Sequence, residues 1–246
     1  MITRILVDRE GKYFYQQDGQ DVSTHFGMIR ADALAIVADG STVLSNTNQV
    51  FTVLTPTWLD IYRRLKRGPQ IMMLKDLGVV AAETGIGRDS IIGDAGTGSG
   101  AAACYFAHIA KRVYSYDIVP EHTAIGEANA KLFGYTNVSF AVHDVYDSIP
   151  APEEGQYDLF LLDNPEPWRA LPHADVIKIG GWIVGYLPSI NQTAEFVNQV
   201  LLNPKFQHRK TVEVIERDWA IKGLKVRPSS AALGHTGFLV FVRRIA

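Results

Sequence analysis

A glycine-rich segment, residues 94–100 with the sequence DAGTGSG, carries the strongest chemical signal in the chain. It follows an apolar run that predicts a strand and precedes a run of small residues that predicts a helix. Glycines at such a turn let the backbone approach a ligand closely, and the start of the helix supplies unpaired N–H donors. A tight turn without a ligand is the less favoured interpretation, because three glycines alternate after an acid. The expected cofactor contacts are Asp94, Gly96, Thr97, Gly98, Ser99 and Gly100.

The spacing of these glycines narrows the kind of cofactor. It differs from the G-x-G-x-x-G pattern of dinucleotide sites, and the Gly-Lys-Ser/Thr of a phosphate-binding loop is missing. The segment therefore argues against NAD and against ATP as the ligand bound at this turn.

Two further acids, Asp117 and Asp144, follow the next two predicted strands. A carboxylate at the end of the second strand can accept both hydroxyls of a ribose. In a doubly wound sheet the carboxyl ends of these strands line one crevice, so both acids can converge with Asp94 on one nucleoside-like ligand. Any one of the three alone would more often be a helix cap or a surface charge.

Residues 162–168, with the sequence LDNPEPW, follow the fourth predicted strand. They place a carboxylate, two prolines and an aromatic ring beside the expected cofactor, so we expect this loop to hold the substrate. A structural interpretation fits the loop equally well when it is taken alone. In that interpretation Asp163 caps the helix that follows Pro167, and Trp168 packs in the core.

The elements that position these residues alternate from residue 91 onward. Strands are predicted over 91–95, 113–117, 138–142, 157–163 and 182–187, and helices over 101–110, 121–133, 167–177 and 193–202. This alternation predicts right-handed crossovers and a mostly parallel sheet. The runs 211–215 and 236–242 have no helical pattern between them, which predicts an antiparallel hairpin at one edge of the sheet.

The first 54 residues have a different pattern. Short β-rich runs over 2–7, 12–15, 42–44 and 50–54 are separated by turn residues, which predicts a small antiparallel β-domain. We therefore expect a β-rich domain over 1–54 and an α/β domain over 55–246, with 55–90 as a helical lead-in. A basic cluster, Arg63 to Arg67, lies on the first predicted helix, where a solvated face is slightly favoured over a phosphate contact.

Composition excludes several classes of protein. The chain has 246 residues, 47% of them hydrophobic and 20% charged, which allows a sizeable core and argues against disorder. No apolar run is long enough for a membrane helix, and charged residues come too early for a secretory signal, so we expect a cytoplasmic protein.

The single cysteine excludes an intrachain disulfide and a thiolate zinc cluster, and no metal is expected. A net charge of −2 argues against binding of nucleic acid over the whole surface, but it allows local basic patches.

The glycine turn, Asp117 and the pair Asp144-Val145 together resemble the S-adenosylmethionine pocket of class I methyltransferases. The predicted strands and the terminal hairpin agree with that resemblance. It implies a Rossmann-like α/β fold with a mostly parallel sheet and S-adenosylmethionine as the cofactor.

Nearly the whole chain resembles a narrower family, the tRNA (adenine-N1)-methyltransferases that act on position 58 of the T loop, of the homo-oligomeric type found in bacteria and archaea. The matching segments occur in the same order: 24–27, 67–71, Lys75-Asp76, 94–100, 162–168, 180–181, 187–192, 226–228, 234–239 and 243–244. The resemblance implies tRNA as the partner and assembly as a homotetramer. The chain departs from the family in its shorter amino terminus, in Leu74, in Asn164, and in Asp117, which stands where glutamate is commoner.

The chemistry of this reaction indicates a catalytic role for Asp163. The N1 atom of neutral adenine carries its own lone pair, so its attack on the sulfonium methyl needs alignment more than a strong base. Because the product is cationic, a carboxylate that accepts a hydrogen bond from the exocyclic amino group stabilises the developing charge. The resemblance adds His122 and Gln70 beside the cofactor, with a surface position as the alternative for His122. The expected tRNA contacts are Arg64, Arg67, Trp168, Tyr186, Arg227 and His235.

Two other functions compete with this interpretation. The segment 164–168 is similar to the Asn-Pro-Pro-aromatic loop of methyltransferases that modify exocyclic amino groups, although the inserted Glu166 counts against them. A non-catalytic tRNA-binding subunit is the second alternative, and such a subunit has no need of an intact cofactor turn. Whether a neighbouring adenine is modified together with position 58 is left open by the sequence.

Overall fold

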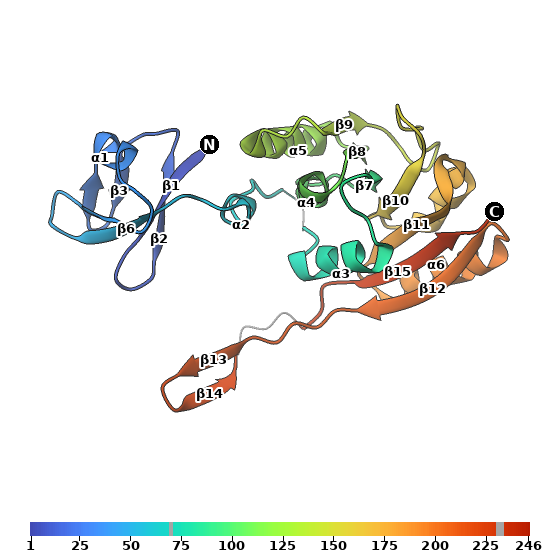
Figure 1. Cartoon of the computed structure of the whole chain (residues 1–246). Coiled ribbons are helices and arrows are strands. Elements are labelled where there is room, and N and C mark those ends of the chain that lie inside the picture. Colours follow the sequence, from blue (N-terminus) through green and yellow to red (C-terminus); the bar gives the residue numbers. More distant parts are fainter. Residues whose placement is uncertain (69–70, 230–233) are drawn as a thin grey trace. The chain divides into compact units, whose positions relative to one another are not determined.

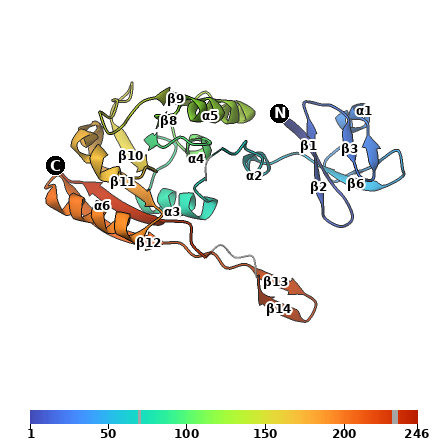
Figure 2. The same ribbon diagram turned by 180° about the vertical axis from the view of Figure 1, so that it is seen from behind.

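The computed structural model describes residues 1–68, 71–229 and 234–246. This part of the chain forms two compact units, shown from two sides in Figures 1 and 2. The first unit comprises Met1–Leu65 and Leu132–Gly134, and the second comprises Lys66–Lys131 and Tyr135–Ala246. No described helix combines the length and the apolar character that crossing a membrane requires.

The first unit is built on a four-stranded antiparallel sheet with the order β2-β1-β6-β5. Its strands are β1 (Ile2–Val7), β2 (Tyr13–Gln17), β5 (Thr42–Leu44) and β6 (Val50–Leu54). A small pair, β3 (Val22–Thr24) and β4 (Gly27–Ile29), and the short helix α1 (Ala31–Ala35) complete the unit. Phe51 and Val53 alternate along β6 and are fully buried against Leu6 and Leu34, as a sheet with one apolar face requires.

Helix α2 (Trp58–Tyr62) belongs to this first unit, whereas the sequence analysis placed the boundary after residue 54. The aromatic ring of Trp58 lies 4.7 Å from that of Tyr62 and 6.0 Å from that of Phe133. A capping box between Thr57 and Asp60 begins the helix. The first contact lies within α2, and the second joins α2 to the segment Leu132–Gly134, which is also part of the first unit. The division between the units falls after Leu65.

The second unit contains a seven-stranded sheet with the order β12-β15-β11-β10-β7-β8-β9. The five strands from β11 to β9 are parallel, while β15 is antiparallel to both β11 and β12. This arrangement confirms the expected mostly parallel sheet with antiparallel strands at one edge. The strands are β7 (Ile91–Ala95), β8 (Arg112–Asp117), β9 (Val138–Val142), β10 (Tyr157–Leu162), β11 (Ile177–Leu187), β12 (Phe206–Glu213) and β15 (Phe238–Arg244).

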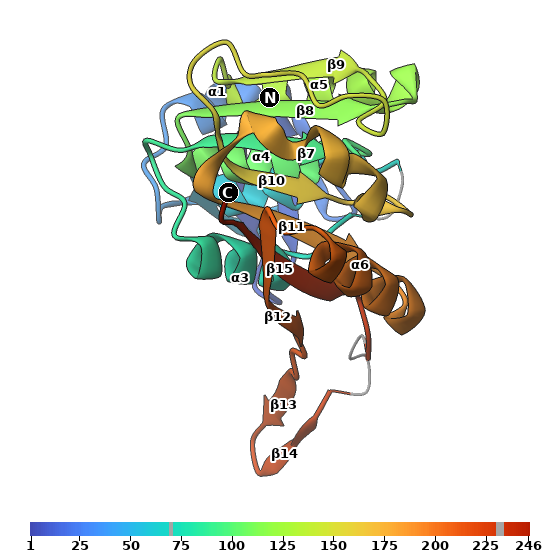
Figure 3. The same ribbon diagram turned by 90° about the vertical axis from the view of Figure 1, so that its right-hand side faces the viewer.

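Helices cover both faces of this sheet, and Figure 3 shows α3 and α6 on opposite sides of β15. On one face, Ala170 and Phe196 are buried in one cluster with Phe160 and Ile183 of the sheet. Apolar contact from both sides is what a parallel sheet requires. The helices of this unit are α3 (Leu74–Thr84), α4 (Ala101–Ile109), α5 (Pro120–Phe133), the 3-10 helix η1 (Pro167–Val176) and α6 (Ile190–Leu202).

Several elements differ from their predicted form. Helix α2 ends at Tyr62, so the basic cluster Arg63 to Arg67 follows that helix and is not on it, and β12 begins five residues before the predicted run 211–215. The segment after Pro167 is a 3-10 helix with Pro172 inside it, because proline cannot donate the backbone hydrogen bond of a regular α-helix. Strand β11 begins five residues earlier than predicted, and a register shift against β10 accommodates Gly180 at a φ of 80°. A separate hairpin, β13 (Trp219–Lys222) and β14 (Lys225–Pro228), lies between β12 and β15 in the chain, so these two strands are not joined by a simple turn.

Candidate active site

The cofactor turn joins β7 to α4 and can be built only from glycines at several positions. Gly96, Gly98 and Gly100 have φ angles of 96°, 51° and 70°, a region that side-chain-bearing residues rarely adopt. A Cβ atom on Gly96 would lie 2.3 Å from the carbonyl oxygen of Asp163, and one on Gly100 would lie 2.6 Å from the Cα of Gly126. The turn is therefore packed directly against the backbone of β10 and α5.

A pocket of about 410 Å³ opens beside this turn, at the carboxyl ends of the parallel strands. This is where ligands bind in open α/β sheets. The pocket brings together seven of the expected site residues: Gly96, Gly98, Asp117, His122, Asp144, Val145 and Asp163. Its wall also contains Ile118, Val119 and Tyr146, which were not predicted as site residues. The available signal was their position directly after Asp117 and Val145.

Asp117 is fixed in the wall of the pocket by the turn itself. Its Oδ2 accepts a hydrogen bond from the backbone N–H of Gly98 at 3.0 Å, and its Oδ1 accepts one from the N–H of Val119 at 2.9 Å. The Nδ1 atom of His122 lies 3.1 Å from Oδ2, which places this histidine at the pocket and not on a free surface. Carboxylate oxygens have two lone pairs each, so Asp117 keeps acceptor capacity for a ligand.

Four of the expected cofactor contacts support the turn from behind and do not line the pocket. Asp94 is buried, and its Oδ2 accepts from the hydroxyl of Ser115, which lies 2.7 Å from that of Thr97. Ser99 accepts from the N–H of Gly68 at 2.9 Å, and Gly100 packs on α5. Within the described chain, Oδ1 of Asp94 has no hydrogen-bond partner. Gln70, also expected at the cofactor, lies outside the described residues.

Burial and the closeness of three carboxylates raise the free energy needed to ionise Asp163 and Asp94. Burial and, after it, the neighbouring carboxylates of Asp94 and Asp117 together raise the pKa of Asp163 to about 7. Burial also raises the pKa of Asp94 to about 7, although its hydrogen bond from Ser115 acts in the opposite direction. A cationic group in the pocket would relieve this cost, so the site suits a ligand or product with positive charge.

Asp163 extends the pairing of β10 with β7, because its backbone N–H donates to the carbonyl of Ala95 at 2.8 Å. It does not cap the following helix. The N-cap residue of η1 is Glu166, and no side chain caps that end. The structural interpretation of Asp163 as a helix cap is therefore wrong, and its side chain lies in the pocket wall.

Trp168 and Tyr186, expected beside the substrate, pack into the protein. Trp168 is half-buried against the core of the sheet, which corresponds to support of the loop from behind. The buried ring of Tyr186 occupies the space that a side chain at Gly237 would fill, 2.6 Å from an ideal Cβ. Its hydroxyl lies 3.4 Å from Oδ2 of Asp76. Neither ring lines the pocket.

Lys75 and Asp76 form a buried network that the sequence analysis noted without assigning a role. The Nζ of Lys75 donates to Oδ1 of Asp76 at 2.8 Å, to the carbonyl of Val214 at 2.7 Å and to the hydroxyl of Thr236 at 2.6 Å. Thr236 in turn donates to Oδ2 of Asp76 at 2.9 Å. The start of α3 is thus tied to the segments that follow β12 and precede β15.

His235 is engaged through both ring nitrogens. Nδ1 lies 2.5 Å from the carboxylate of Glu213, and Nε2 lies 2.9 Å from the carbonyl of Pro188. Both partners only accept, so this arrangement favours the protonated ring, in which both nitrogens donate. The Glu213 contact, followed by the Pro188 carbonyl, accordingly raises the pKa of His235. His235 joins the ends of three strands, and its nitrogens are not free for the edge of a base.

The three arginines expected to contact tRNA are exposed and do not line the pocket. Arg64 belongs to the first unit, where its guanidinium lies 4.4 Å from the ring centroid of Tyr15. Arg67 belongs to the second unit, and Arg227 lies on β14.

The sheet order, the glycine turn and the acidic pocket define a class I S-adenosylmethionine-dependent methyltransferase. Solved structures with this fold include an S-adenosylmethionine-dependent O-methyltransferase from Thermotoga maritima, with a TM-score of 0.86 and 22% identity over 100% of this chain and 93% of that chain. The tRNA (m1A58) methyltransferase TrmI from Aquifex aeolicus has a TM-score of 0.81 and 24% identity over 99% of this chain and 97% of its own. At these identities the likeness shows the fold.

Sequence comparison shows the family. The sequence model of the tRNA methyltransferase complex GCD14 subunit matches residues 50–227. The chain is 30% identical over 272 residues to the tRNA (adenine(57)-N(1)/adenine(58)-N(1))-methyltransferase TrmI of Methanocaldococcus jannaschii, covering 98% of this chain and 94% of that relative. It is also 30% identical over 247 residues to the tRNA (adenine(58)-N(1))-methyltransferase TrmI of Thermus thermophilus, covering 98% and 96%. The chain belongs to this tRNA methyltransferase family, which confirms the resemblance described above.

Proposed function

We propose that this protein methylates the N1 atom of adenine 58 in the T loop of tRNA, with S-adenosylmethionine as the methyl donor. The observation that carries the proposal is that, in a chain of this family, the glycine turn and the two acidic residues expected at the site surround one pocket. Gly96, Gly98, Asp117 and Asp163 surround one cavity. A non-catalytic tRNA-binding subunit would have no need of this arrangement, and no observation favours methylation of an exocyclic amino group.

The residues of the pocket fit S-adenosylmethionine. The glycine turn offers a backbone that no Cβ shields. Oδ1 of Asp117 accepts one hydrogen bond within the protein and keeps a lone pair for a ribose hydroxyl. Asp144 and Val145 form the wall next to Asp117. When bound, this cofactor supplies an electrophilic methyl group on a sulfonium.

Asp163 then acts on the adenine. In the proposed reaction its carboxylate accepts a hydrogen bond from the exocyclic amino group, which orients N1 and stabilises the positive charge that develops on the ring. The carboxylates of Asp94 and Asp117 make a cationic base more favourable here than a neutral one. A base inside a folded loop must be extruded to reach this position, which costs a few kcal/mol of stacking.

Binding of the rest of the tRNA is assigned to exposed basic residues. We place phosphate contacts at Arg64, Arg67 and Arg227, which have no part in the chemistry. Such contacts fix the position of the substrate and weaken with salt. The cytoplasmic location expected from the sequence is consistent with such a substrate.

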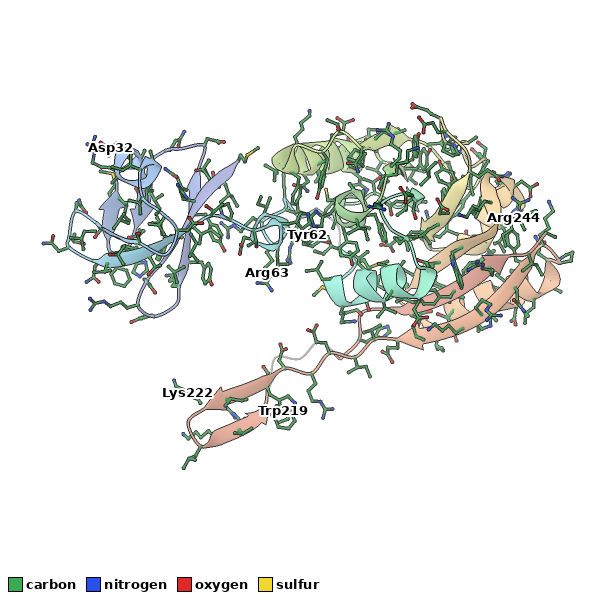
Figure 4. All side chains as sticks on the ribbon, in the orientation of Figure 1. Asp32, Tyr62, Arg63, Trp219, Lys222 and Arg244 are labelled. Carbon is green, nitrogen blue, oxygen red and sulfur yellow. The ribbon has the colours of Figure 1, made fainter. Side chains whose placement is uncertain are left out.

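We also propose that the protein works as a homo-oligomer, as its family resemblance implies. The support is the hairpin β13–β14, labelled at Trp219 and Lys222 in Figure 4. Trp219 pairs with Pro228 and Ile221 with Val226, so one face of the hairpin is apolar, and all four residues are exposed. An isolated two-stranded hairpin is only marginally stable in water, and an exposed apolar face favours association. A second copy of this chain is the proposed partner.

Mapping of modified nucleosides tests the proposed function. Unmodified tRNA transcript is incubated with the purified protein and S-adenosylmethionine, digested, and analysed by mass spectrometry. We expect 1-methyladenosine at position 58, and no such product from a transcript with uridine at that position. Methylation only at the exocyclic amino group, or none at all, would contradict the proposal. Additional product at adenine 57 would define a broader specificity.

A further inference from the structure

Tyr146 is in contact with both the cofactor pocket and the acceptor loop. Its half-buried side chain lines the pocket, directly after Asp144 and Val145. Its backbone N–H donates to Oδ1 of Asp144 at 2.8 Å. Its phenol oxygen accepts a hydrogen bond from the backbone N–H of Glu166 at 2.9 Å. One side chain therefore links the pocket wall to the loop that carries Asp163.

Two further contacts, one near the start of η1 and one in its last turn, hold this helix to the same residue. The guanidinium of Arg169 lies 4.4 Å from the centroid of the Tyr146 ring and forms an ion pair with Glu166 at 3.1 Å. The Nε2 atom of His173 lies 3.0 Å from the carbonyl oxygen of Tyr146. A cation over an aromatic ring is stabilising, and here it restrains the same ring whose hydroxyl holds Glu166.

The acceptor loop has few other anchors. Asp163 donates its N–H to Ala95, and Gln192 donates to the carbonyl of Pro165 at 3.0 Å. Between these points and η1, the hydrogen bond to Tyr146 fixes the backbone at Glu166. A small displacement of a catalytic group reduces the rate strongly, so the anchoring of this loop matters for Asp163.

We propose that Tyr146 is a positioning residue that couples occupancy of the cofactor pocket to the placement of Asp163. A ligand in the pocket excludes water from the Tyr146 ring and restricts its motion. The hydrogen bond to Glu166 becomes stronger as water is excluded, and the acceptor loop is held in the geometry that transfer requires. This inference rests on the proposed function, since it assumes that Asp163 contacts the adenine.

Hydrogen exchange at the Glu166 amide tests the coupling directly. The probe is S-adenosylhomocysteine, which has no methyl group to transfer, and exchange of a peptide covering 163–168 is followed by mass spectrometry. In the unmodified protein the ligand should slow this exchange. In Tyr146→Phe the ring remains, but the acceptor of the amide is lost, so most of the ligand-dependent protection should be lost. Tyr13→Phe removes an exposed phenol in the first unit and should retain all of it.

Binding and kinetics separate positioning from other roles. Affinity for S-adenosylhomocysteine in Tyr146→Phe should change little, while the single-turnover rate at saturating tRNA should fall about 3- to 10-fold, the range for one neutral hydrogen bond. Arg169→Gln, which keeps the phenol, should lower the protection in part. The inference is overturned by full protection of Glu166 in Tyr146→Phe, or by a loss of ligand affinity equal to the loss of rate. Failure of the proposed function is distinct from either result, because the unmodified protein would then not methylate tRNA.

Discussion

Gly96 and Asp163 are in direct backbone contact, with the Asp163 carbonyl oxygen 2.3 Å from the place that a Cβ on Gly96 would occupy. The end of β7, which carries the cofactor turn, is thus packed against the end of β10, which carries the proposed catalytic carboxylate. No side chain separates the two. A side chain at residue 96 would force these two strand ends apart, so their close packing requires glycine there.

Gly96→Ala should therefore abolish cofactor binding. The methyl group would clash with the Asp163 backbone, in addition to the cost of a φ of 96° for a non-glycine residue. Gly85→Ala is the matched control, because Gly85 also has a positive φ, of 66°, but nothing lies within 4 Å of its ideal Cβ. Both variants should lose some stability, and only Gly96→Ala should lose affinity for S-adenosylhomocysteine in calorimetry. Equal affinities in the two variants would show that the turn tolerates the clash.

The rate of methyl transfer should rise with pH up to about 7 and then level off. The pKa of Asp163 is raised to about 7, chiefly by burial. Below that pH the protonated carboxyl cannot balance the charge on the product. Rates at cofactor concentrations well below saturation report the ligand-free protein, so between pH 5.5 and 8.5 they should show this step, and those of Asp163→Asn should not. A flat profile in the unmodified protein would remove the titrating carboxyl from the rate-limiting step.

The ionisation of Asp163 should also affect the free energy of unfolding, and its contribution should decrease as the pH rises. A carboxyl whose pKa rises from 3.8 in the unfolded chain to about 7 in the folded protein binds protons more tightly when folded. Its contribution to stability is present at low pH and is lost as pH rises towards 7. Without ligand, the free energy of unfolding of Asp163→Asn should therefore increase relative to the unmodified protein between pH 4 and 7. A relative decrease, measured by urea denaturation, would indicate that the charged form of Asp163 stabilises the fold.

Loss of two arginines should weaken tRNA binding without affecting the cofactor. Arg64→Ala combined with Arg67→Ala removes two exposed cations, and each lost phosphate contact should reduce the slope of log affinity against log salt by about 1. Arg88→Ala is the control, because that exposed arginine lies beside Asp89 at 3.7 Å. Affinity for S-adenosylhomocysteine should stay the same in all three proteins. If the double variant has the salt slope of the control, the basic cluster is a solvated segment after α2 with no part in tRNA binding.

Charges on the apolar face of the hairpin should reduce the oligomeric state. Ile221 and Val226 are directly paired and are 73% and 58% exposed, so Ile221→Asp with Val226→Asp places two repelling charges in the proposed interface. Lys222→Ser changes the opposite face and should leave assembly unaltered. Sedimentation equilibrium measures the outcome. A double variant with the same mass as the unmodified protein would exclude this face from the interface.

Local patterns in the sequence were sufficient to predict the sheet and the cofactor turn. The strands over 91–95 and 138–142 have the predicted bounds, because a short apolar run between turn residues is defined by its own neighbours. The glycine turn was equally predictable, because its positive φ angles require glycine and its glycines are visible in the sequence. These signals located the pocket from residues at or near the ends of strands.

Contacts between distant residues were not predictable in this way. The hydrogen bond from Glu166 to Tyr146 and the network of Lys75 with Thr236 depend on which side chains the fold brings together. The sequence also could not show that Asp94 lies behind the turn while Asp117 lines the pocket. Both acids lie at or near the ends of neighbouring strands, and only packing distinguishes them.

The measurement that tests the account most directly is the single-turnover rate of Asp163→Asn. The substitution keeps the size of the side chain and removes the charge assigned to stabilisation of the cationic base. A transition-state contact of this kind is worth about 2.7–4 kcal/mol, so the rate should fall roughly 100- to 1,000-fold. Affinities for tRNA and S-adenosylhomocysteine should change little, and the melting temperature should not fall. A rate close to that of the unmodified protein would contradict the assignment of Asp163 as the catalytic residue.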